Sequence, residues 1–113
     1  YIMDMFNLGL NFLLGYLEKL DKKTVIDYID NNRPLLPVIQ NALIKNSISI
    51  VKFVLRAYWK KIDKYLHNGD YIIQTIVSKR PDLKDVLESE RGRRWVYEQL
   101  RQIYDFLYKF TWS

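Results

Sequence analysis

Apolar residues recur at every third or fourth position along most of this chain, and no stretch alternates strictly between apolar and polar residues. The segment NSISIVKFVLRAYWKKIDKYL shows the pattern well, and its apolar positions are Ile48, Val51, Val54, Leu55, Tyr58, Ile62, Tyr65 and Leu66. This period is typical of amphipathic helices, whereas half-buried strands would alternate. The sequence therefore predicts an all-α fold, a compact bundle of about six to seven short-to-medium helices.

Turn and capping residues indicate where the expected helices begin and end. Asp21, Asn46 or Ser47, Asp70 and Ser89 are of the types that cap helix starts. We expect helices at about 4–20, 22–29, from the turn with Pro34 and Pro37 onward, and at about 47–66, 70–80, 81–88 and 90–110. With 113 residues the chain is long enough for one core, so 1–113 is expected to be a single domain. Because it starts at Tyr1 without methionine, we expect a piece excised from a larger protein.

Composition narrows the function classes. The chain has no cysteine and one histidine, His67, so it offers neither disulfides nor a zinc site of the Cys/His type, and we expect no structural metal. No nucleophile, base and orienting group occur at a recognisable spacing, so an independent catalytic centre is not expected. The most apolar stretch, 8–20, is interrupted by charged residues and predicts neither a transmembrane span nor a signal peptide. We expect a cytoplasmic domain without membrane contact. A role at a membrane surface ranks third among the possible functions, because no helix combines a fully apolar face with a strongly lysine-lined edge.

The positive charge is concentrated in the middle of the chain. The net charge is +5, and residues 45–64 hold six Lys or Arg against one acidic residue. The cations proposed to contact nucleic acid here are Lys52, Arg56, Lys60 and Lys64. If 47–66 is one helix, Trp59 lies opposite its apolar side and among these cations, where it can stack on bases. Two alternatives stay open: Trp59 packs against another helix, and the lysines form an ordinary solvated helix face.

The last expected helix repeats the combination of aromatic and cationic residues. One flank carries Arg93, Tyr97, Arg101, Tyr104 and Tyr108 at helical spacing. We predict that Tyr97, Arg101 and Tyr104 also contact nucleic acid, although tyrosines commonly line the rim of a core instead. Near its start lie Arg91, Arg93, Arg94 and Trp95. Cations are unfavourable at the positive end of a helix, so a nucleoside triphosphate such as ATP, with Mg²⁺ if carboxylates hold it, is predicted to bind there.

The same two basic segments resemble a known family. A helical domain of this size that is basic around WKKIDKY and RGRRW, and rich in isoleucine, lysine and tyrosine, resembles the helix-bundle accessory domain of archaeal plasmid primase-polymerases. The resemblance covers the length of the chain. It implies that the domain binds single-stranded DNA template and nucleoside triphosphates beside a catalytic domain of the same parent chain, and so supports primer synthesis.

A second resemblance leads to a different function. The segment VIQNALIKNSISIVKFVLRAYWKKI is similar to helical docking domains of transcription factors. It implies a protein-docking module that binds an acidic amphipathic peptide with the same exposed aromatic residues.

Overall fold

The computed structural model describes residues 15–113, and every regular element within them is helical. Residues 15–19 are helical. They are followed by α2 (Lys22–Asp30), α3 (Leu36–Ile44), α4 (Ile48–Ala57), α5 (Trp59–Leu66), α6 (Gly69–Lys79), a 3₁₀ turn (Pro81–Leu83), α7 (Lys84–Leu87) and α8 (Glu90–Trp112). The all-α prediction is therefore confirmed for this part of the chain. The expected first helix falls mostly on residues before 15, outside the described residues.

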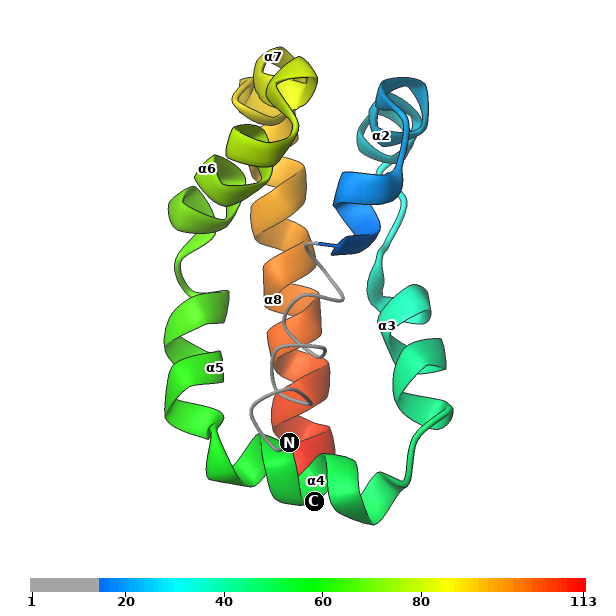
Figure 1. Ribbon diagram of the computed structural model, residues 1–113, viewed down its shortest axis with the longest axis vertical. Coiled ribbons are helices and arrows are strands. Elements are labelled where there is room, and N and C mark those ends of the chain that lie inside the picture. The colour runs from blue at the N-terminus through cyan, green and yellow to red at the C-terminus, as the bar shows by residue number, and fades with distance from the viewer. Residues whose placement is uncertain (1–14) are drawn as a thin grey trace.

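Helix α8 is the centre of the fold. It is 23 residues long, about 35 Å at 1.5 Å per residue, and contacts each of α2 to α7. In Figure 1, α2 and α3 lie along one side of α8, α5 and α6 along the other, and α4 crosses near the end of α8 that carries the C-terminus. A helix surrounded in this way buries a wide arc of its surface. The α8 residues that are buried are Gly92, Trp95, Val96, Gln99, Leu100, Ile103, Leu107 and Thr111.

Of the four expected caps, Asp21 and Ser89 make their side-chain hydrogen bonds, Ser47 occupies the cap position of α4 without one, and Asp70 is displaced. The Asp21 carboxylate accepts a hydrogen bond from the Thr24 amide, and the Ser89 hydroxyl accepts one from the Gly92 amide at 3.0 Å, which confirms both predictions. The prediction that Asp70 caps α6 is wrong. The helix begins one residue earlier, at Gly69, and the side chain of Asn68 accepts from the Tyr71 amide. Asp70 lies in the first turn of α6, and its carboxylate accepts hydrogen bonds from Arg93 and Tyr97 of α8.

The helix expected at 47–66 is two helices. It breaks at Tyr58, whose φ of −109° and ψ of 18° are not helical. The Tyr58 amide still donates to Val54, and its carbonyl accepts from Lys61 and Ile62, so the break leaves no orphan backbone group at this residue. No glycine or proline marks the position. The break lets α4 cross the end of α8 while α5 runs along its side (Figure 1).

The α3–α4 pair is unusually apolar for its exposure. No residue of α3 is fully buried, although seven of its nine residues, LPVIQNALI, are apolar. In the described part of the chain no single helix is long and apolar enough to cross a membrane. The two helices reach that length and apolarity only together, and the chain direction turns by 117° between them.

Candidate functional site

Four aromatic side chains form a continuous row between α5 and α8. The ring of Trp59 lies 5.7 Å from Tyr104, 5.9 Å from Tyr108 and 6.2 Å from Trp112, measured between centroids. Tyr104 and Tyr108 are one turn apart on α8, and their rings are stacked at 6.1 Å with 28° between the planes. We call Trp59, Tyr104, Tyr108 and Trp112 the aromatic row. Tyr108 and Trp112 are each 50% exposed, so the row offers ring faces and edges to solvent.

The position predicted for Trp59 is wrong, and the helix break is the reason. A continuous helix would have placed this ring opposite the core side, but α5 begins at Trp59 itself with a new direction. The ring is half-buried and packs on the aromatic residues of α8. The alternative, in which Trp59 packs against another helix of the fold, is therefore confirmed. Trp59 packs on the partly buried ring of Tyr104 and on the exposed rings of Tyr108 and Trp112.

Cations occur on α4 and α5, the two helices that carry Arg56 and Trp59. Lys60 and Lys64 are exposed, one turn apart on α5, and neither is ion-paired with a carboxylate in the described part of the chain. The Arg56 guanidinium lies 5.9 Å from the Trp112 centroid, and its Nε donates to the Thr111 carbonyl at 2.8 Å. Lys52 lies elsewhere: its ammonium is 5.4 Å from the centroid of Phe110, roughly 160° around α8 from Tyr108 at 100° per residue.

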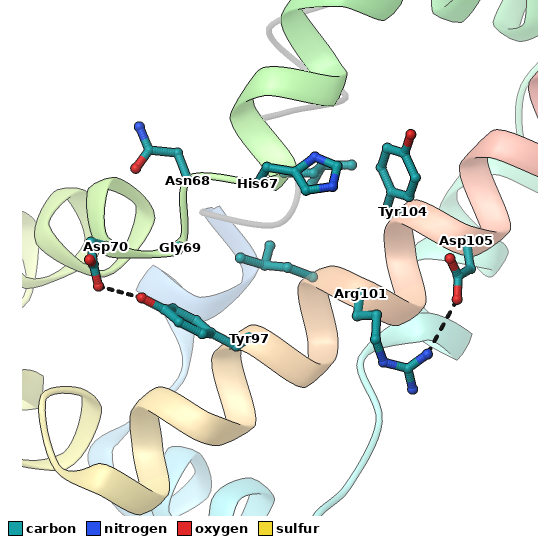
Figure 2. A pocket seen from close by; sticks show the side chains of 10 residues that line it. His67, Asn68, Gly69, Asp70, Tyr97, Arg101, Tyr104 and Asp105 are labelled. Carbon is teal, nitrogen blue, oxygen red and sulfur yellow. Dashed lines mark hydrogen bonds and ion pairs between the residues drawn. The ribbon is translucent and has the colours of Figure 1, made fainter.

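A pocket of about 440 Å³ opens beside the row, between the α5–α6 turn and α8 (Figure 2). It is lined by Leu66, His67, Asn68, Gly69, Asp70, Tyr97, Leu100, Arg101, Tyr104 and Asp105. Three residues predicted to bind nucleic acid, Tyr97, Arg101 and Tyr104, therefore meet here. The imidazole of His67 lies edge-on to Tyr104 with 4.7 Å between ring centroids, so the pocket and the row share the Tyr104 ring. Burial, with Asp63 close by, raises the pKa of the Tyr104 phenol, which stays protonated at neutral pH.

Polar groups around the pocket already bind one another. The Tyr97 hydroxyl donates to the Asp70 carboxylate, as Figure 2 shows, and Arg93 donates to the same oxygen. The hydrogen bond from Tyr97, together with the charge of Arg93, lowers the pKa of Asp70, and the bond to Asp70 raises the pKa of Tyr97. Gly69 allows the close approach, because a Cβ there would lie 2.2 Å from the Tyr97 ring. Arg93 and Tyr97 thus tie the start of α6 to α8.

The other arginines of α8 also face carboxylates. Arg91 pairs with Asp30 at 3.1 Å, and Arg94 pairs with Glu90 at 2.8 Å. Arg101 bonds to Glu98 and, at 3.3 Å, to Asp105. The carboxylates offset the unfavourable placement of cations near a helix start, so no bound anion is needed to explain it.

The assignment of Trp95 to an exposed nucleotide site is wrong. The side chain is buried, with 3% of its surface exposed, and its indole N–H donates to the Arg33 carbonyl at 3.0 Å. Its ring packs edge-on against Tyr28. Trp95 belongs to the core that joins α8 to α2 and the following loop.

The sequence prediction did not include Trp112 and His67 among the site residues. A signal for Trp112 was available, because it continues the spacing of four from Tyr104 and Tyr108. The position of His67 carried no such signal, since it follows the C-terminus of α5 and depends on how that helix packs against α8.

Comparisons with known proteins give no relative: no protein-family model, curated protein or solved structure matches the chain. Among the described residues, no group of three or more acidic or histidine side chains is close enough together to hold a metal ion.

Proposed function

We propose that this domain binds single-stranded nucleic acid along the aromatic row, as an accessory module of a replication protein such as a primase. The observation that carries this proposal is the row itself: Tyr104, Tyr108 and Trp112 succeed one another by one helical turn beside Trp59. Successive rings give successive bases a surface on which to stack, without selecting a sequence. DNA template is the substrate that the resemblance to primase accessory domains favours.

The charges near the row suit a phosphate backbone. Lys60 and Lys64 are exposed on α5, the helix that begins with Trp59, and lack ion-pair partners among the described residues, so binding phosphate would break no ion pair. Stacking on rings combined with such cations is the usual way in which proteins hold single strands without sequence preference. In this proposal the catalytic step of primer synthesis belongs to another domain of the parent protein.

A nucleoside triphosphate has weaker support. Arg91, Arg93 and Arg94 each face a carboxylate, and Trp95 is buried. A triphosphate would have to displace three acidic side chains and would find no exposed indole for its base. We therefore restrict the proposed ligand to the polynucleotide.

The test measures oligonucleotide binding by variants of the exposed end of the row. Trp112→Ala should weaken the binding of a labelled thymidine oligonucleotide by about 1–3 kcal/mol, the usual loss for one stacked base. Tyr71→Ala is the matched control, because Tyr71 is 56% exposed and lies on α6, outside the row. Equal weakening by both variants, or none by Trp112→Ala, would show that the row is not the binding surface.

The alternative function is a docking module for an acidic amphipathic peptide, favoured by the same exposed rings and lysines. The salt dependence of binding distinguishes the nucleic-acid-binding function from the peptide-docking function. Single-strand binding should fall steeply with salt in proportion to the number of phosphate contacts, whereas a peptide held mostly by apolar contacts should respond weakly. A shallow salt dependence, together with tight binding of an acidic helical peptide at the row, would favour the alternative.

A further inference from the structure

A second exposed surface lies at the α3–α4 corner. Ile44, the last residue of α3, is 72% exposed, and Ile48, Ile50 and Phe53 of α4 are 54%, 49% and 62% exposed. Ile50 and Phe53 are one turn apart and about 60° from each other around α4, and only 45–47 separate Ile44 from that helix, whereas Ile48 lies about 160° around α4 from Ile50. We call Ile44, Ile50 and Phe53 the apolar corner. Large apolar side chains that cluster on a surface generally mark a contact with another apolar phase.

The segment that contains the apolar corner carries only positive charges. No aspartate or glutamate occurs anywhere in 31–62, and Lys45 lies between the two helices, whereas Lys52 and Arg56 contact Phe110, Thr111 and Trp112 of α8. The nearest acidic residues along the chain, Asp30 and Asp63, lie outside this segment. A partner of the corner should therefore combine an apolar interior with a negatively charged surface.

Shape and composition favour a lipid bilayer over a peptide. A peptide helix needs a groove, but the corner is the turn between two helices whose direction changes by 117°, at one end of the molecule (Figure 1). Helix α4 lies across the end of α8, as an interfacial helix lies in the plane of a membrane. The α3–α4 pair also has the length and apolarity of a membrane segment, although its bend makes insertion into one leaflet the natural mode.

We propose that the apolar corner inserts shallowly into an anionic membrane surface, with Ile44, Ile50 and Phe53 among the acyl chains and Lys45 at the headgroups. Exposed isoleucine and phenylalanine side chains gain by leaving water, and long lysine side chains reach back to phosphate while their stems stay in the apolar layer. This surface is separate from the aromatic row, so the inference does not depend on nucleic-acid binding.

The experiment uses the full chain and two kinds of vesicle, phosphatidylcholine alone and phosphatidylcholine mixed with phosphatidylglycerol, in a sedimentation assay. The chain should bind the anionic vesicles more tightly. Ile44→Ser with Phe53→Ser should weaken that binding on the order of tenfold or more, because two apolar insertions are lost. Lys45→Gln should weaken it about fivefold, the usual effect of a cation near an anionic surface.

The matched controls are the same types of substitution made on α2, at the other end of the molecule. Ile26→Ser and Lys23→Gln alter exposed residues of that helix and should leave vesicle binding unchanged. Ile44 and Phe53 are mostly exposed, so their variants should keep the wild-type melting temperature, and they should also keep oligonucleotide affinity if the row is the nucleic-acid surface.

Three results would overturn this assignment. The first is that the protein does not sediment with either type of vesicle. The second is that Ile26→Ser weakens vesicle binding as much as the double variant Ile44→Ser with Phe53→Ser, the corner variant. The third is a dimer, or a complex with an acidic peptide, that the corner variant abolishes while vesicle binding persists, which would make the corner a protein interface. Oligonucleotide binding that fails while vesicle binding holds would reject the proposed function and leave the membrane surface standing.

Discussion

Replacing Lys60 and Lys64 together by glutamine should flatten the salt dependence of oligonucleotide binding. Both side chains are exposed on α5, the helix that begins with Trp59 of the aromatic row, and neither has an ion-pair partner within the described residues. Each phosphate contact contributes about 0.7 to the slope of log K against log salt concentration on a single strand, so the double variant should reduce the slope by about 1.4. Arg56 is left unchanged, because its Nε is committed to the Thr111 carbonyl.

The matched control is the pair Arg91→Gln with Arg94→Gln. It changes the net charge by the same amount, but it lies at the opposite end of α8 from Trp112, and both arginines are paired with carboxylates. If phosphates lie along the row, this control should lower affinity slightly through the overall field and leave the slope nearly as it was. The two variants together thus separate a local contact from a general loss of charge.

The assay is the fluorescence anisotropy of a labelled thymidine oligonucleotide over a series of sodium chloride concentrations, with circular dichroism to confirm the fold. An unchanged slope in the lysine variant would refute the placement of the backbone along α5. A slope flattened only in the arginine variant would move the site to the start of α8, the position that the sequence had assigned to a triphosphate.

Three further predictions concern the scaffold. Trp95→Ala should lower the free energy of unfolding by about 3–5 kcal/mol in urea titrations because it empties a core position, and a near-normal unfolding midpoint would contradict the buried placement. Asp70→Asn should lower the melting temperature at neutral pH. The folded-state pKa of Asp70 is depressed below its ordinary 3.8, so its stabilising effect is complete above that pH, fades as the pH falls through the folded value, and should leave variant and wild type alike in stronger acid. Gly92→Ala should cost about 1–3 kcal/mol, since its Cβ would lie 2.0 Å from the Val86 carbonyl oxygen; wild-type stability would show that the α7–α8 turn can yield.

Local signals in the sequence were enough for the helical architecture. The apolar period fixes helix type, and Asp21 and Ser89 mark helix starts because their side chains bond to amides only three residues away. The break at Tyr58 has no such local origin. The backbone groups of Tyr58 form the hydrogen bonds expected beside a helix end, and the break lets α4 and α5 pack separately on α8. Because this break depends on tertiary packing, the spacing of apolar residues in the sequence does not reveal it.

The site was only partly predictable for a related reason. The flank of α8 with Tyr104 and Tyr108 follows directly from helix geometry. The burial of Trp95 does not follow from helix geometry. On a helix whose core-facing side is centred on Val96 and Leu100, Trp95 lies at the edge of that side. This edge is buried only because α8 is the central helix and has neighbours on several sides. The pairs that Arg91 and Arg93 make with Asp30 and Asp70 join residues 61 and 23 positions apart, so no spacing rule connects them.

Arg56 connects the two proposed surfaces, and its contacts limit what it can do for either. It extends from α4, the helix of the apolar corner, to the Thr111 carbonyl and the face of Trp112, the last ring of the row. Carbonyls in the last turn of α8 lack helical partners, and the helix dipole favours a cation there, so this contact stabilises the end of the central helix. Removing Arg56 would therefore disturb the position of Trp112 and the angle of α4 together. A loss of either binding activity in such a variant would not identify a phosphate contact, whereas Lys60 and Lys64 on one surface and Lys45 on the other can be changed without altering a described ion pair.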